Sequence, residues 1–198
     1  RAWEQYGLLD DLHRSLALYE AGWQRNPQDP DSCYCADQAA FVYDLLAFRI
    51  GTGAQSGHIL TNGDAADGAY QDERVQQFRR CAENLRQIAL AEVQRRQRLW
   101  PQHFQEDIHS LITLANLQLG LGLQDTHLLP AATGSFQAAV SLIQQAHGAD
   151  AQENRERHAA EEWAIQEVFK QAMALTRLHN YLPPECSNPS LDNPHPDW

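Results

Sequence analysis

The stretch from Glu106 to Gln145 constrains the fold most, because its apolar residues recur at steps of three and four on both sides of a turn. This spacing places them on one face of a helix in each half. The first half ends near Gly120 and Gly122, which we expect to loosen the end of its helix. Pro130 stands in the first turn of the second half, where a helix tolerates proline. The stretch therefore predicts a helical hairpin.

The rest of the chain also predicts helices. The same spacing favours helices over residues 2–23, 36–50, 70–99 and 151–180. Between them, residues 51–69 are rich in glycine and predict a long loop, either mobile or used for binding. Residues 181–198 hold five of the nine prolines and predict an extended or disordered tail. No segment alternates as a strand does, so we expect an all-α fold. It would have about six helices in one domain over residues 1–180, stacked as hairpins or as an irregular bundle.

The net charge of the chain limits the kinds of partner that it can bind. The 198 residues include 15 basic and 26 acidic ones, a net charge of -11, and 43% are hydrophobic, as in a globular domain. An acidic surface repels phosphate groups, so we expect no nucleic acid and no membrane as a partner. No apolar run approaches the length that crosses a bilayer. Arg95, Arg96 and Arg98 form a local basic cluster, which we interpret as a solvated helix flank.

The cysteines and the first residue bear on the compartment. Cys33, Cys35, Cys81 and Cys186 allow reduced or structural thiols, which we favour, or disulfides, while their spacing does not suit zinc. The sequence starts at Arg1 without a methionine, so a targeting segment would lie outside it. We expect a cytoplasmic protein, with a secreted or periplasmic one left open.

Small and large residues recur at fixed steps within the hairpin. The positions are Leu111, Leu114, Ala115, Gln118 and Gly122 in the first half and Ala132, Phe136 and Ala139 in the second. They resemble the two helices of a tetratricopeptide repeat. Residues 15–27 and 89–101 share the spacing of a second helix and its closing proline, more in position than in residue type. The resemblance covers about half of the chain, and its competitor is a generic helical bundle.

The resemblance implies a non-catalytic domain for protein–protein interaction, such as an adaptor, scaffold or inhibitor that grips a partner in a helical groove. By the same resemblance, His109, Ile112, Asn116 and Leu119 would face that partner. The negative net charge favours a protein or peptide of basic or mixed charge. We expect no cofactor. We interpret four tryptophans as helix-packing residues rather than exposed binding residues, namely Trp3, Trp23, Trp100 and Trp163.

The alternative function is a metal-dependent helical-bundle enzyme. Glu106 and His109 have the E-x-x-H spacing that brings a carboxylate and an imidazole to one helix face in metal-binding bundles. A di-iron site needs a second such pair, and Asp10 with His13 supplies only a weaker analogue. We therefore favour solvated charges at these positions and expect no metal. No nucleotide-binding or nucleophile motif occurs in the sequence. A third possibility is a regulatory part of a larger chain that holds another domain.

Overall fold

The computed structural model of the chain describes residues 9–26, 30–55, 64–146, 166, 170 and 172–176. Every regular element in these ranges is a helix, which confirms the predicted all-α class. The elements are α2 (Leu9–Arg25), α3 (Pro30–Gln55), α4 (Asp64–Leu99), α5 (Pro101–Glu106), α6 (Ile108–Gly122), the 3-10 helix η1 (Thr126–Leu128) and α7 (Leu129–Ala146). The predicted tail, and most of the helix predicted over residues 151–180, lie outside the described residues.

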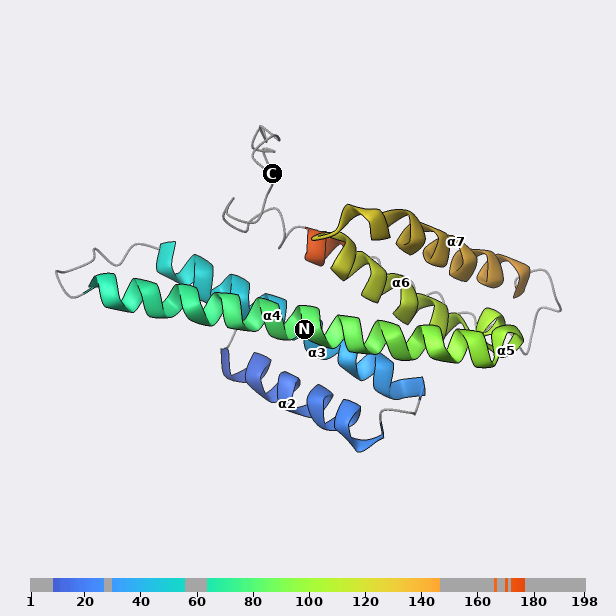
Figure 1. Cartoon of the computed structure of the whole chain (residues 1–198), viewed down its shortest axis with the longest axis horizontal. Helices are drawn as coiled ribbons and strands as arrows, with labels where there is room; N and C mark the ends of the chain where they lie inside the picture. Colours follow the sequence, from blue (N-terminus) through green and yellow to red (C-terminus); the bar gives the residue numbers. More distant parts are fainter. Residues whose placement is uncertain are drawn as a thin grey trace.

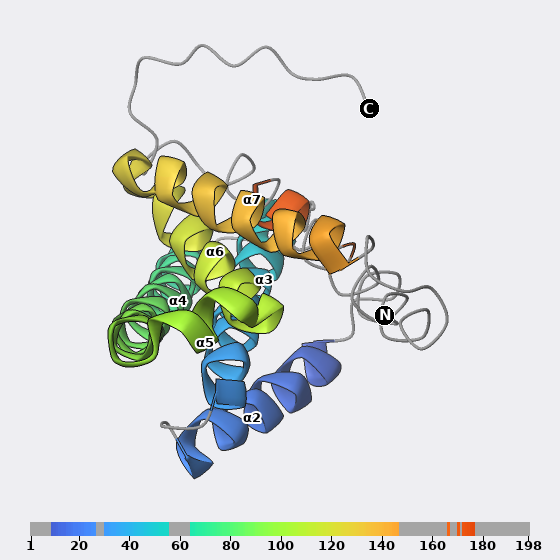
Figure 2. The same ribbon diagram turned by 90° about the vertical axis from the view of Figure 1, so that its right-hand side faces the viewer.

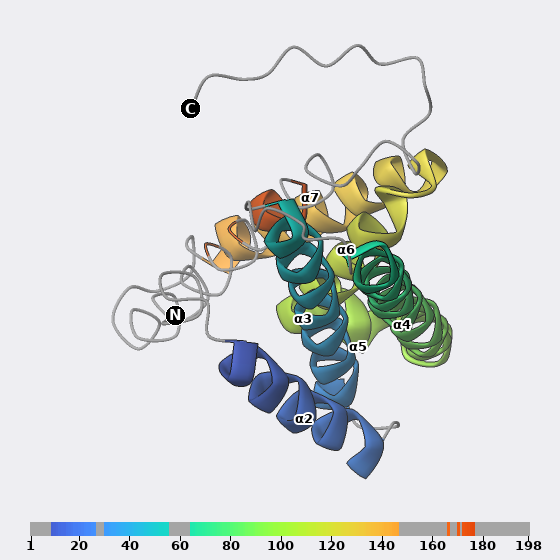
Figure 3. The ribbon, with the colours of Figure 1, turned by 90° about the vertical axis from the view of Figure 1, so that its left-hand side faces the viewer.

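The helices form a stack of layers. The long helix α4 runs antiparallel to α3, and α2 packs on the other side of α3 (Figure 1). Helix α6 lies on α4 and α3, and α7 packs against α6. The end-on views show this order from α2 to α7 (Figures 2 and 3). None of the described helices is both long enough and apolar enough to span a membrane.

Helices α3 and α4 reach further into the predicted loop over residues 51–69 than the sequence indicates. Helix α3 starts at Pro30 rather than Ala36 and continues to Gln55, and α4 starts at Asp64 rather than near Tyr70. The prediction of a loop is therefore wrong at both ends, and residues 56–63 lie outside the described part of the chain.

Proline and packing account for these longer helices. Pro30 occupies the first position of α3, where its missing N–H would have no helical partner in any case. Gly51 lies close to α4, since a Cβ built on it would stand 3.8 Å from a methyl group of Val75. Contact between α3 and α4 thus outweighs the weak helix propensity of glycine there.

Apolar side chains form two large clusters that share α3 and α4. The first cluster joins the start of α3 and the C-terminal part of α4 to α5, α6 and α7, and it includes the fully buried Leu117. The second joins their middle to α2 and includes the fully buried Leu46. A smaller cluster packs Leu175 of the 172–176 segment against Phe41 of α3. Helices α3 and α4 therefore contribute side chains to both large clusters.

Helices α6 and α7 form the predicted hairpin, with Pro130 in the first turn of α7. The role predicted for the two glycines is wrong, because both are buried within the helical last turn of α6. A Cβ at Gly120 would stand 2.7 Å from Cδ of Arg86, and one at Gly122 would stand 2.8 Å from Cδ2 of Leu129. These glycines permit close approach of neighbouring side chains rather than loosening the helix.

Candidate functional site

The four residues predicted to contact a partner are not presented together. His109 is exposed and Leu119 is half-buried, but Ile112 and Asn116 are only 5% and 2% exposed. The Asn116 amide donates a hydrogen bond to Asp37 at 3.2 Å, inside the stack. Because α6 is covered by α4, α3 and α7, the chain itself fills the space that a partner would need. The prediction is therefore wrong for Ile112 and Asn116.

The predicted metal pair is separated by a break between two helices. Glu106 is the last residue of α5, and α6 starts at Ile108. Between them Asp107 is extended (φ -100°, ψ 101°), and its carboxylate accepts hydrogen bonds from the backbone N–H of His109 at 3.1 Å and the hydroxyl of Ser110 at 2.6 Å. Glu106 and His109 are exposed and do not share one continuous helix face, so the premise of the pair is wrong.

The described residues also lack a larger metal-binding cluster. Nowhere in the ranges 9–26, 30–55, 64–146 and 172–176 do three or more histidine, cysteine, aspartate or glutamate side chains come together as metal ligands would. Within these ranges, no further ligands therefore accompany Glu106 and His109.

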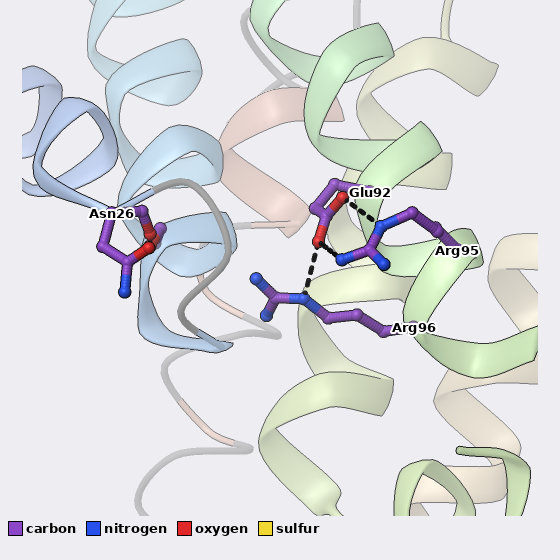
Figure 4. A network of polar contacts seen from close by, with 5 residues as sticks. Asn26, Glu92, Arg95 and Arg96 are labelled. Carbon is purple, nitrogen blue, oxygen red and sulfur yellow. Dashed lines mark hydrogen bonds and ion pairs between the residues drawn. The ribbon is translucent and has the colours of Figure 1, made fainter. Parts of the chain in front are cut away.

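The basic cluster on α4 is neutralised in part by its own helix. Arg95 donates two hydrogen bonds to Glu92, at 2.8 and 2.7 Å, and Arg96 donates a third at 3.0 Å (Figure 4). These bonds lower the pKa of Glu92 below its usual range, and those from Arg95 contribute most to this shift. Arg98 is exposed as predicted, but Arg96 is only 8% exposed, so the interpretation as a solvated flank is wrong for this residue.

The cysteines give no sign of cross-linking in the part of the chain that the structure describes. Cys33, Cys35 and Cys81 form no disulfide there, and Cys186 lies outside it. Burial raises the pKa of the Cys33 thiol to about 11, which makes it a poor nucleophile at neutral pH. Cys33 is therefore a packing residue.

The tryptophans divide between core and surface. Trp23 packs against the first apolar cluster, as predicted for a helix-packing residue. Trp100, at the corner between α4 and α5, is 56% exposed, so that prediction is wrong for it. Trp3 and Trp163 lie outside the described residues.

An open groove with a volume of about 400 Å³ lies between α4 and the turn that joins α6 to α7. The residues that line it are Glu83, Gln87, Leu90, Ala91 and Gln94 of α4 and, opposite, Leu121, Gln124, Asp125 and Leu128. The leucines are buried or half-buried and form its apolar base, while Ala91 is exposed. The groove thus combines an apolar base with a polar rim.

The polar rim is acidic and rich in amides. Glu83 and Asp125 contribute carboxylates from opposite walls, and none of the residues that line the groove is basic. The Gln87 amide donates a hydrogen bond to Glu83 at 3.1 Å, which leaves its carbonyl oxygen able to accept another. Gln94 and Gln124 add two further side-chain amides to the rim. The rim therefore offers donors, acceptors and negative charge to a ligand.

Sequence reasoning misses this groove. On α4, Glu83, Gln87 and Gln94 follow at steps of four and seven, which places them on one helix face. This shared helix face could have indicated one wall of the groove, but a row of glutamines is also typical of a solvated surface. The opposite wall comes from residues 121–128, and no local pattern shows that the two segments meet.

Comparisons of the chain with protein-family models, with curated proteins and with solved structures find no match. The resemblance to tetratricopeptide repeats therefore stays a prediction.

Proposed function

We propose that the chain is a non-catalytic protein-interaction domain whose groove between α4 and the α6–α7 turn binds a short segment of a partner protein. The segment would carry basic or mixed charge. The observation that supports this proposal is the groove's lining, which joins a leucine base to two carboxylates and three side-chain amides without a basic residue.

The size and charge of the groove suit such a ligand. A volume of about 400 Å³ falls within the range of roughly 300–1,000 Å³ that is usual for ligand sites. The carboxylates of Glu83 and Asp125 would attract lysine or arginine side chains, and the net charge of -11 would speed their approach. In this proposal, a tetratricopeptide-like stack of helices serves only as the scaffold that holds the two walls of the groove.

A screen with displayed random peptides tests the proposal. The whole chain is the bait, and the affinity of each enriched peptide is measured by fluorescence anisotropy. We expect the enriched peptides to contain lysine or arginine beside aliphatic residues. We expect Ala91→Arg, which fills the groove and adds a positive charge, to weaken their binding at least about tenfold.

Ala138→Arg is the matched control, since Ala138 is an exposed alanine on α7 that does not line the groove. It adds the same side chain and should leave affinity unchanged, with circular dichroism confirming that both variants fold. The proposal fails if no peptide is enriched, or if the enriched peptides bind Ala91→Arg as tightly as the unaltered chain.

A further inference from the structure

The groove's dimensions and its amides point to the conformation of the ligand. We infer that the bound segment is extended rather than helical, with its backbone held by the side-chain amides of Gln87, Gln94 and Gln124. This inference rests on the proposed function and adds what the groove recognises.

The length of the α4 wall sets the length of the segment. Glu83 and Gln94 are eleven positions apart, which at 1.5 Å per residue is about 16 Å along the helix. An extended chain advances about 3.3 Å per residue, so about five residues span this wall. Gln87 and Gln94 are separated by about 10 Å, or about three extended residues. The two amides would therefore meet backbone groups of different residues along an extended segment.

The amides distinguish an extended segment from a helix. A glutamine side chain both donates and accepts, and those of Gln87, Gln94 and Gln124 line the groove. In an extended segment the backbone N–H and C=O groups need outside partners, whereas a helix pairs most of these groups internally. The row of amides would therefore strengthen binding of an extended chain and add little for a helix.

The base and the carboxylates fit alternating side chains. Successive side chains of an extended segment point to opposite sides, so every second one can reach Leu90, Leu121 and Leu128 in the base. The others lie toward the rim, within reach of Glu83 and Asp125. A segment that alternates aliphatic and basic residues satisfies both surfaces.

Three fluorescent probes test the inference by anisotropy with the whole chain. The first is a peptide of about six residues that alternates leucine and arginine, and the second is the same peptide with alternate backbone nitrogens methylated. The third is an alanine-rich helical peptide with the same leucines and arginines on one face. We expect the first probe to bind, and the second and third to bind at least about tenfold more weakly.

Two variants test whether the side-chain amides cause the difference in affinity between the probes. Gln94→Leu should weaken the first probe by about two- to tenfold, the cost of one hydrogen bond, and should leave the methylated probe unchanged. Gln77→Leu, an exposed glutamine of α4 that does not line the groove, is the control and should change neither.

The possible failures are distinguishable. If the methylated or helical probe binds as tightly as the first, or if none of the three binds, the extended mode is overturned. The proposed function would still stand as long as displayed peptides bind in a manner that Ala91→Arg blocks. If Ala91→Arg does not weaken the binding of any peptide, both the extended mode and the proposed function are overturned.

Discussion

Arg86 is a buried arginine that is held from several sides. It lies in the middle of α4 at 2% exposure, and its guanidinium pairs with Asp44 of α3 at 2.5 Å. Its side chain also lies against Gly120 of α6, so one residue joins three helices. A buried cation is costly without its partner, which means that Arg86 cannot move away from Asp44 to make room. The glycine at position 120 is therefore dictated by an arginine far away in the sequence.

This arrangement predicts that Gly120→Ala lowers the free energy of unfolding by about 1–3 kcal/mol, the usual cost of overpacking. The new Cβ would stand 2.8 Å from Cζ of Arg86. The measurement is the midpoint of urea denaturation, followed by circular dichroism.

The control is Gly134→Ala on α7, where a Cβ would meet nothing within 4 Å. It should raise stability by about 0.5–1 kcal/mol, because alanine favours a helix interior. Equal stabilisation by both variants would show that Gly120 is not closely packed.

At the scale of elements, the start of α6 depends on Asp107. Its carboxylate accepts the hydrogen bond from the backbone N–H of His109 and so caps the helix. The same residue ends α5, which is why Glu106 and His109 do not act as a pair on one helix. A spacing that looks helical in sequence thus crosses a boundary that a capping residue creates.

We expect Asp107→Ala to destabilise the chain by about 0.5–2 kcal/mol, since the first turn of α6 loses its cap. Thermal denaturation of this variant beside Asp107→Ser, which retains a capping oxygen, measures the effect. A variant with serine as unstable as the one with alanine would argue against capping and for another role of the carboxylate.

Periodicity predicts the class of the fold and the α6–α7 hairpin, because both depend on residues close together in sequence. It does not predict where α3 ends or where α4 begins, since contact between the two helices stabilises the turn that contains Gly51. Asn116 is assigned to a groove only through the resemblance to a tetratricopeptide repeat. Its burial against Asp37 depends on contacts between helices, as does the meeting of the two walls of the real groove.

At the scale of the whole molecule, a net charge of -11 means that negative groups repel one another. A carboxylate that is paired with an arginine therefore contributes to the stability of the fold. Glu92 is held by Arg95 and Arg96, and the bond from Arg95 contributes most to the lowering of its pKa. A carboxyl whose pKa is lower in the folded state stabilises the fold above the pKa of the unfolded chain, about 4.3 for glutamate. This contribution is lost as the pH falls through the folded value.

Glu92→Gln should therefore be less stable than the unaltered chain at pH 7, and the difference should shrink as the pH falls below about 4. Urea denaturation at a series of pH values measures this trend. Glu73→Gln, an exposed position on the same helix, should show little difference at any pH. A gap for Glu92→Gln that stays constant down to acid pH would mean that the carboxylate's charge is not the cause.

The order of the layers also bears on how quickly the chain can reach its fold. Helix α2 packs on α3, α3 on α4 and α6 on α7, so many contacts join elements that follow one another along the chain. Local contacts of this kind need only short loops to close, and helical proteins built from them fold in microseconds to milliseconds. The docking of α6 onto α3 and α4 instead needs contacts between distant parts of the chain, since Asp37 and Asn116 meet across 79 positions, and we expect it to be the slower step. The buried Asp37–Asn116 pair thus lies at the contact that joins the most distant parts of this stack.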